Sequence, residues 1–263
     1  MNFPTDSSGL DQFRFSMKII QYLTERLVER SPETALKLLR SKHGELWIAR
    51  ALNKPDGSKW SDLEVPPQLE GFEDLSFLFW SSPLNRRFIR LDLDEAAALY
   101  KVVKSIPNAH GIEIGRFNGG STVLLAFAVG PNGGLLSIDS APQDDQALKV
   151  FLRHANLLER VELVVADAGA FEHEAQVDFV FIDGDHSYEG AKRDHNMWGS
   201  KVRPGGFIIH HDMGKARPLA SQWESLAKLN SEIIAAQADI LELAHEAGSM
   251  IIFRRRSSPW KPV

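Results

Sequence analysis

The chain has 263 residues, of which 43% are hydrophobic and 25% charged, and its formal net charge is −5. This composition is typical of a globular protein with one or two domains, and the mild acidity argues against a protein that coats nucleic acid. The sequence has no cysteine, which excludes disulfides, thiolate catalysis and Cys-ligated zinc or iron–sulfur sites.

No segment of the sequence indicates export or a membrane partner. The first residues, MNFPTDSSGLDQF, lack the basic and then apolar pattern of a secretory signal. The apolar run Val123–Val129 is far shorter than the roughly 20 residues that cross a bilayer. We therefore expect a cytoplasmic protein.

Residues 1–92 differ from the remainder in their hydrophobic pattern, which predicts a mostly helical N-terminal extension. Met17–Arg40 carries apolar residues at spacings of three and four, which predicts two short amphipathic helices broken near Ser31 and Pro32. Residues 53–70 are rich in Pro, Asp and Ser and predict a loop. The helices pack either on the following domain or on a second copy of the chain, as a homodimer or higher homo-oligomer.

Residues 93–263 alternate between helical stretches and short apolar runs. The first helix is expected over Asp92–Ile106, where Asp92 and Glu95 have capping-box spacing. Further helices are expected over Ser121–Ala128, Gln146–Leu158, Tyr188–Gly199 and Leu219–Leu229. Strands are expected over Gly111–Ile114, Leu135–Ile138, Val161–Val165, Val177–Ile182, Gly206–His210, Ile240–Leu243 and Ser249–Arg254.

This alternation predicts an α/β fold: a Rossmann-like, doubly wound, mostly parallel seven-stranded sheet. The last two strands, joined by a His-Glu-Ala-Gly turn, would form an antiparallel hairpin at one edge. In such a sheet, ligands bind outside the carboxyl ends of the strands, where the strand order reverses. The residues that follow each strand are therefore the candidate site.

The first strand is followed by a glycine-rich loop with glycines at 115, 119 and 120. These glycines allow the backbone to pass close to a ligand before a helix begins. The spacing is not GxGxxG, so a dinucleotide diphosphate is disfavoured. Asp139, after the second strand, is placed to accept hydrogen bonds from a ribose diol, although a helix cap is an equal alternative. Asp167 and Ala168, after the third strand, are placed to meet an adenine.

A dense polar cluster follows the fourth and fifth strands. Asp183, Asp185 and His186 lie within four residues, and His211 and Asp212 follow one strand later. Because adjacent strands lie about 4.8 Å apart, Asp183 and the His211–Asp212 pair can converge on one point. Carboxylates and imidazole together suit a divalent cation with open positions. His110 and His210 are expected to be structural or buried histidines, and His195 to lie on a solvated helix face.

Several segments together resemble class I S-adenosylmethionine-dependent methyltransferases: EIGRFNGGST, LLSIDS, VVADA, VDFVFIDGDHSYEGAKRDHNMW and KVRPGGFIIHHD. The closest group is the small-molecule O-methyltransferases that share a FIDGDHSYE segment and a PGG–HD segment. The resemblance spans roughly residues 93–255, in the same order and spacing.

The resemblance implies a role for each strand end. The methionine part of S-adenosylmethionine would lie against the first loop, Asp139 and Ser140 would bind the ribose, Asp167 and Ala168 the adenine, and Asp183 would stand near the methionyl end. The implied residues of the first loop are Glu113, Gly115, Phe117, Asn118, Gly119 and Ser121. Residues 1–92 would cover the active site, bind substrate or form a dimer.

The resemblance also implies a metal set of Asp183, His211 and Asp212. Metal-dependent relatives usually carry two acidic residues or Asp-Asn at the second position, so His211 is a departure. It is compatible with a nitrogen ligand to Mn or another ion rather than Mg, or with a base or substrate contact in a metal-free enzyme.

Methyl transfer to a hydroxyl requires that the hydroxyl lose its proton as attack occurs. A metal would lower the hydroxyl pKa, and a base would take the proton. His186 is the first candidate base, because its unperturbed pKa lies near 6.5, and Asp185 is the second. We therefore expect an O-methyltransferase for a small hydroxylated molecule such as a sugar, a glycoside or a catechol-like compound, with no nucleic-acid partner.

Two alternatives stay open at this point. One is a nicotinamide- or flavin-dependent oxidoreductase on a related sheet, against which the missing GxGxxG counts. The other is a non-catalytic binding module that keeps the fold. Burial of a carboxylate cluster in an apolar setting lowers the stability of the fold and is typical of functional sites, which argues against the second alternative.

Overall fold

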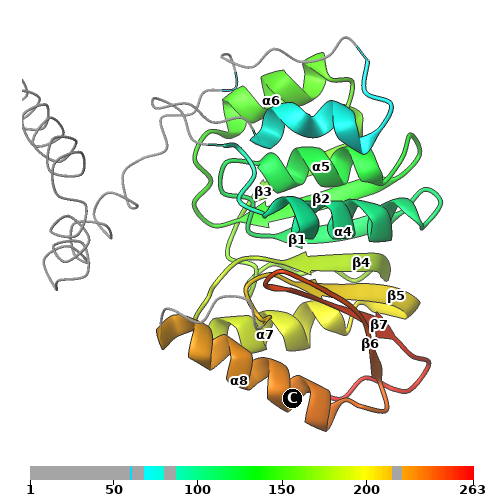
Figure 1. Cartoon of the computed structure of the whole chain (residues 1–263), viewed down its shortest axis with the longest axis vertical. Coiled ribbons are helices and arrows are strands. Elements are labelled where there is room, and N and C mark those ends of the chain that lie inside the picture. Colours follow the sequence, from blue (N-terminus) through cyan, green and yellow to red (C-terminus); the bar gives the residue numbers. More distant parts are fainter. Residues whose placement is uncertain (1–59, 61–67, 80–86, 215–220) are drawn as a thin grey trace, which may run out of the picture. The chain divides into compact units, whose positions relative to one another are not determined.

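The computed structural model describes residues 60, 68–79, 87–214 and 221–263 (Figure 1). The amphipathic helices expected over Met17–Arg40, and most of the loop expected over 53–70, lie outside the described residues. None of the helices in the described part is long and apolar enough to cross a membrane.

The predicted doubly wound sheet is confirmed. Seven strands lie in the order β3-β2-β1-β4-β5-β7-β6, in which β7 is antiparallel to both β5 and β6 and the other pairs are parallel. The strand order reverses between β1 and β4, which is where such sheets bind ligands. The strands are β1 (His110–Ile114), β2 (Gly134–Asp139), β3 (Val161–Val165), β4 (Val177–Ile182), β5 (Val202–His210), β6 (Leu241–Ala247) and β7 (Met250–Arg255).

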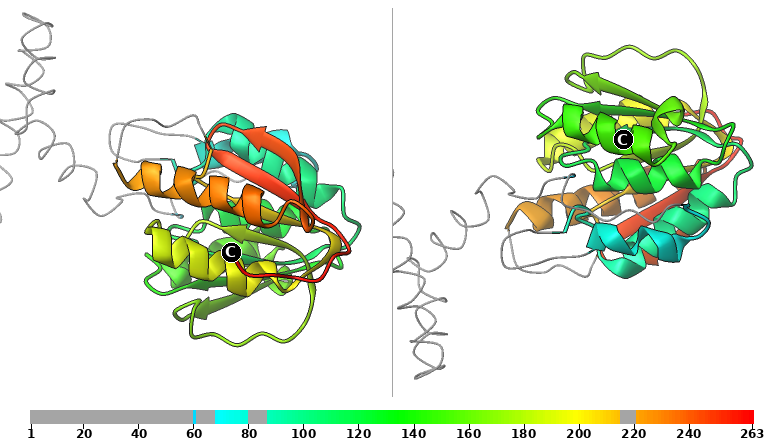
Figure 2. Two further views of the ribbon diagram at one scale, coloured as in Figure 1. Left: turned by 90° about the horizontal axis from the view of Figure 1, so that it is seen from below. Right: turned by 90° about the horizontal axis from the view of Figure 1, so that it is seen from above.

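Helices cover both faces of this sheet (Figures 1 and 2). One face carries α4 (Leu93–Lys104), α5 (Gly120–Ala128), α6 (Asp145–His154) and the 3-10 helix η2 (Phe72–Phe79), and the other carries α7 (Tyr188–Gly199) and α8 (Ser221–Ala236). A short 3-10 turn, η3 (Leu158–Arg160), precedes β3.

Strand alternation explains why there are two cores. In β4, Phe179 and Phe181 pack with α4 and α5, while Val180 and Ile182 pack with α7 and α8. Successive side chains of a strand point to opposite faces, so a strand covered on both sides needs an unbroken apolar run. Phe179–Ile182 meets that requirement, while Asp178, near the start of the strand, accepts hydrogen bonds from the His110 N–H and the Arg203 side chain.

The described residues before α4 pack into the core on the α4–α5 face. Trp60, Leu75, Phe77 and Phe88 are buried there, and the Trp60 ring lies 4.2 Å from that of Phe88 between centroids. The Trp60 indole N–H also donates to the carbonyl of Asn118 at 3.2 Å. Part of the segment expected as an extension therefore touches the glycine-rich loop.

Three expectations were wrong in detail. The helix expected to reach Leu158 ends at His154, because Asn156 adopts a left-handed φ of 57° that stops it. The expected His-Glu-Ala-Gly turn is mostly strand: β6 continues to Ala247, and Gly248, with φ of 54°, makes a tighter turn. The helix expected over Leu219–Leu229 runs on to Ala236 as α8.

His195 is also a correction, because it is fully buried rather than solvated. Its Nδ1 lies 2.9 Å from Nε2 of His210, and its Nε2 lies 2.8 Å from the side-chain oxygen of Gln237. Burial lowers the pKa of His195 to about 4. The ring is therefore neutral and joins α7, β5 and the end of α8.

Trp198 gives a test of the α7–α8 core. Its side chain is fully buried, and its indole nitrogen has no hydrogen-bond partner among the described residues. Trp198→Ala should cost roughly 3–5 kcal/mol in urea unfolding. Trp198→Phe should cost clearly less, because it fills most of the same volume and removes no hydrogen bond. Equal losses for the two variants would contradict this packing.

Candidate cofactor and catalytic site

A cavity of about 810 Å³ opens at the carboxyl ends of the strands, across the point where strand order reverses. The residues expected at the strand ends come together in it. It is lined by Gly115, Phe117, Asn118, Ser121, Asp139, Ser140, Asp167, Ala168, Asp183, Asp185, His186, His211 and Asp212. Glu113 and Gly119, which the sequence also indicated, lie close by without lining it.

Asp139 organises the glycine-rich loop. Its Oδ2 accepts the backbone N–H groups of Arg116 and Phe117, each at 2.8 Å, and its Oδ1 accepts that of Ala141 at 2.7 Å. A carboxylate offers about four acceptor positions, so these donors leave roughly one position on Oδ1. The carboxylate thus fixes the loop and can still accept one further hydrogen bond from the cavity.

Gly115 explains why the loop can lie so close to β4. Its φ of 85° is left-handed, and a Cβ at this position would lie 2.2 Å from the carbonyl oxygen of Asp183. Both features exclude any larger residue without displacement of the strand end. The glycine therefore keeps the loop and Asp183 in register at the floor of the cavity.

The Arg116 side chain links the glycine-rich loop to neighbouring elements. Its guanidinium is buried, binds Asp145 through two nitrogens at 2.8 and 2.6 Å, and donates to the carbonyls of Ser137 and Val164 at 2.9 Å. The side chain thereby joins β2, β3 and the start of α6. Nothing in the sequence pattern marked Arg116, because its partners lie 21 to 48 residues away.

Glu113 is fully buried beneath the loop and accepts three hydroxyl hydrogen bonds. Ser121 and Thr122 of α5 donate at 2.6 Å, and Ser137 of β2 donates at 2.5 Å. Burial raises the pKa of Glu113 to about 7, although the three hydroxyls oppose this rise. In the structure Glu113 thus holds the start of α5 against the sheet.

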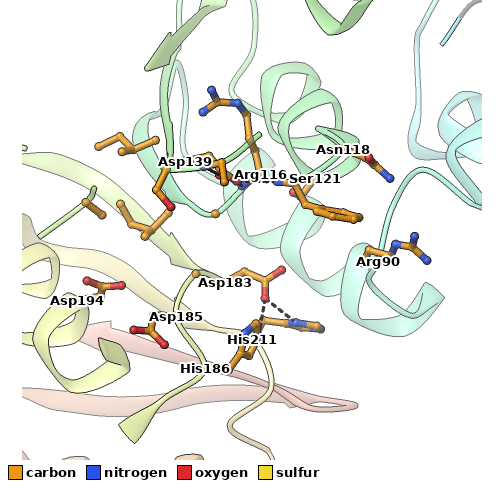
Figure 3. Close-up of a pocket in the computed structure, with 18 of the residues that line it drawn as sticks. Arg90, Arg116, Asn118, Ser121, Asp139, Asp183, Asp185, His186, Asp194 and His211 are labelled. Carbon is orange, nitrogen blue, oxygen red and sulfur yellow. Dashed lines mark hydrogen bonds and ion pairs between the residues drawn. The ribbon is translucent and has the colours of Figure 1, made fainter. Parts of the chain in front are cut away.

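The end of the cavity at β4 and β5 is a cluster of carboxylates and imidazoles (Figure 3). His211 Nδ1 lies 3.0 Å from Asp183 Oδ1 and 3.3 Å from Asp212 Oδ2. His186 Nε2 lies 3.4 and 3.2 Å from the same two oxygens. Asp183 and Asp212, from adjacent strand ends, thus converge as the sequence predicted.

The electrostatics of this cluster favour charged forms. Burial alone would lower the pKa of His211, but Asp183, Asp212 and Glu95 outweigh it and hold that pKa well above its usual range. Hydrogen bonds to Asp183 and Asp212 raise the pKa of His186 to about 9. The two imidazoles in turn keep the pKa values of both aspartates below their usual values, against the effect of burial.

The remaining predicted residues have more peripheral positions. Asp167 is largely exposed, accepts the N–H of Gly169 at 2.9 Å and lies 3.4 Å from Arg193. Asp185 accepts the N–H of Ser187 at 2.8 Å, and this backbone hydrogen bond lowers its pKa. Asp185 is therefore charged and a weak base in this structure.

Asp194 is a lining residue that the sequence did not indicate. It is buried on α7 and pairs with Arg193 at 3.2 Å. Burial raises the pKa of Asp194 despite that pairing. The sequence could have indicated Asp194 only if the cavity were already known, because helix periodicity would then place it on the face of α7 toward the cavity.

Three side chains of the cluster form a possible donor set for a divalent cation. Among the described residues, Asp183, His186 and Asp212 each offer a ligand atom, and these atoms lie within 4.8 Å of one another. Two carboxylates and one imidazole are a suitable set. His211 lies in the same cluster, but both of its ring nitrogens face carboxylates.

Comparison with known families agrees with this geometry. Residues 112–213 match the family described as a methyltransferase domain. The matched residues run from β1 to just beyond the end of β5 and so include the strand ends that border the cavity.

Two curated proteins are similar to part of this chain. Tricin synthase 1 of Oryza sativa subsp. japonica is 28% identical over 134 residues, 47% of this chain and 52% of that protein. Catechol O-methyltransferase of Mycobacterium tuberculosis is 31% identical over 107 residues, 37% of this chain and 44% of that protein. The chain therefore spans about half the length of the curated relatives it matches.

A solved structure extends the comparison of the fold. Cofactor-bound Rv0187 from MTB has a TM-score of 0.52 and 20% identity over 65% of this chain and 83% of that one. At this identity the likeness concerns the fold alone.

Glu113→Gln tests the buried carboxyl group. A pKa raised from 4.5 to about 7 means that the folded structure favours the protonated form of Glu113 over the charged form by roughly 3 kcal/mol. The folded state binds the proton of Glu113 more tightly than the unfolded state does. This contribution to the free energy of unfolding is therefore fully present below pH 4.5 and is lost as the pH rises through 7. Glu113→Gln should therefore gain several degrees in melting temperature relative to wild type between pH 5 and pH 8.

Exposed Glu162→Gln is the matched control and should show no such trend. An unchanged difference between Glu113→Gln and wild type across this range would show that Glu113 titrates normally.

Proposed function

We propose that this protein is an S-adenosylmethionine-dependent methyltransferase that methylates a hydroxyl of a small molecule. The proposal rests mainly on one observation: the glycine-rich loop, Asp139 and the cluster of Asp183, His186 and Asp212 line the same cavity. The methyltransferase-domain match and the two O-methyltransferase relatives support it.

The cofactor would be held along the carboxyl edge from β3 to β1. Asp167 and Ala168 would meet the adenine, and the remaining acceptor position of Asp139, with Ser140, would take a ribose hydroxyl. The loop from Gly115 to Ser121 would hold the methionine part, with Phe117 exposed to the cavity at 42%. When bound, S-adenosylmethionine supplies an electrophilic methyl group on its sulfonium.

His186 is the proposed base for the acceptor hydroxyl. It lines the cavity, and its Nε2 lies between Asp183 and Asp212. With a pKa of about 9 it is protonated at neutral pH, so it must first release that proton to solvent, to which its side chain is 38% exposed, before it accepts one from the acceptor. Asp185 is the weaker alternative, because its lowered pKa makes it a poorer base.

A divalent metal is a proposed assistant at the same end of the cavity. Asp183 and Asp212 would hold it with His186 as the nitrogen ligand. His211 could take that place only by giving up its contacts with the two aspartates. Such an ion would lower the pKa of an acceptor hydroxyl and orient it. His186 Nε2 cannot serve as ligand and base at once, so the two roles of this residue exclude each other.

The first test is calorimetric titration of the purified protein with S-adenosylmethionine and S-adenosylhomocysteine, with Mn²⁺ or Mg²⁺ and again with EDTA. We expect cofactor binding in the micromolar range with or without metal. Binding of NAD, NADP or a flavin in place of both compounds would reject the proposal.

Two substitutions separate cofactor binding from turnover. Asp139→Asn should weaken S-adenosylhomocysteine binding roughly 10-fold or more, because its amide N–H would oppose the loop donors. Asp183→Asn should abolish transfer of labelled methyl groups to catechol and to a panel of sugars and glycosides. Glu162→Gln serves as the exposed control, and full turnover in Asp183→Asn would refute the assigned role.

His186→Gln separates base from ligand. As a base variant it should lose roughly 10²- to 10⁴-fold in turnover while Mn²⁺ affinity, measured by electron paramagnetic resonance, stays within about twofold. A parallel loss of Mn²⁺ affinity would instead assign His186 to the metal. Unchanged turnover would exclude both roles.

A further inference from the structure

Glu95, on α4, is a buried residue whose contacts reach the catalytic cluster. Its Oε2 lies 3.2 Å from His211 Nε2 and accepts the N–H of Asp92 at 2.7 Å. Its Oε1 accepts both the N–H and the hydroxyl of Ser249 at 2.7 Å. The side chain is fully buried and does not line the cavity.

The capping-box spacing explains only the contact with Asp92. The same carboxylate also joins the turn before β7 and the end of β5, which lie 154 and 116 residues away in sequence. Gly248 makes this approach possible, because a Cβ there would lie 2.6 Å from Glu95 Oε1. Three elements therefore meet on one side chain.

His211 is held from both sides as a result. Its Nε2 faces Glu95, and its Nδ1 faces Asp183 and Asp212. A carboxylate oxygen accepts but does not donate, so each ring nitrogen must present its hydrogen. His211 thus acts as a two-sided donor, and the ring cannot rotate without losing one of these contacts.

We propose that Glu95 is a positioning residue for methyl transfer, acting through His211 to orient the carboxylate of Asp183 toward the cavity. This inference rests on the proposed function. Ser249 adds a second route, because its hydroxyl lies 3.1 Å from Asp212 Oδ1 as well as 2.7 Å from Glu95. Glu95 thereby reaches both aspartates through one intermediate side chain each.

A glutamine cannot replace Glu95 without conflict. Both carboxylate oxygens of Glu95 face two donors each. In Glu95→Gln, the amide group would turn its own N–H groups toward one of these donor pairs. Asp94→Asn is the matched control, since Asp94 precedes it on the same helix and is exposed.

Glu95→Gln should lower kcat for methyl transfer roughly 10- to 100-fold, as supporting residues commonly do. The Kd for S-adenosylhomocysteine should change by less than about threefold, because Glu95 does not line the cavity. Asp94→Asn should match wild type in both measurements. A kcat per folded molecule equal to wild type in Glu95→Gln would overturn the proposal.

A double-mutant cycle distinguishes positioning from a purely structural role. If Glu95 acts mainly through His211, adding Glu95→Gln to His211→Gln should lower kcat by far less than Glu95→Gln lowers it in wild type, with only the route through Ser249 left to lose. Losses in kcat that multiply would show independent effects and contradict the proposal. Melting curves of the variants verify that the compared molecules are folded.

A readout without methyl transfer separates this inference from the proposed function. In long-range ¹H–¹⁵N spectra, wild type and Asp94→Asn should show His211 with hydrogens on both ring nitrogens, assigned with His211→Gln. Glu95→Gln should shift or lose the Nε2–H signal. An unshifted Nε2–H signal in Glu95→Gln would overturn the positioning contact, even if the enzyme is active. If the signal changes as expected but the protein binds no S-adenosylmethionine, only the proposed function is rejected.

Discussion

A carboxylate removed from water must meet hydrogen-bond donors or give up its charge, and the carboxyl edge of this sheet buries several. Glu95, Glu113 and Asp212 are all buried within this edge. Each is held by donors from elements distant in the chain, because its own strand or helix cannot supply enough of them. The need to satisfy these carboxylates therefore fixes how α4, α5 and the turn before β7 lie against the strand ends.

The three carboxylates meet this need in different ways. Glu113 has only hydroxyl donors, and its pKa rises to about 7. Glu95 has two backbone N–H groups, a hydroxyl and an imidazole, and its pKa falls to about 2 although burial opposes this. The first is thus easily neutralised and supports the fold, while the second keeps its charge and holds His211.

Backbone strain appears where these contacts are made. Asp212 has a left-handed φ of 61°, and Phe117, in the glycine-rich loop, has a φ of 48°. Such conformations are unfavourable for residues other than glycine and persist only where surrounding contacts enforce them. At Asp212 the contacts are those with His186, His211 and Ser249. The strain is consistent with a site whose geometry is set before any ligand arrives.

The sequence was sufficient for the sheet and for most of the cavity. Short β-branched and aromatic runs such as Phe179–Ile182, set between turn residues, favour a strand covered on both faces, and topology then brings Asp139, Asp183 and Asp212 to one edge. Helix ends and the β6–β7 turn were less predictable, because they depend on single residues such as Asn156 and Gly248. Arg116 could not be assigned, and Glu95 only as the capping-box partner of Asp92, since local spacing gives no sign of partners many residues away.

Positive charge within the cluster already comes from the protein itself. His186 and His211 lie among the oxygens of Asp183 and Asp212 that would hold a divalent cation. A cation and a donated N–H compete for the same lone pairs, so metal binding requires at least one imidazole to withdraw or to turn a free lone pair inward. Glu95 restrains His211 by its second nitrogen, and the His211 side chain is only 3% exposed, against 38% for His186. Under the proposed function, the choice between metal-assisted and metal-free chemistry would therefore depend mainly on where the more exposed ring, that of His186, lies when an acceptor is bound.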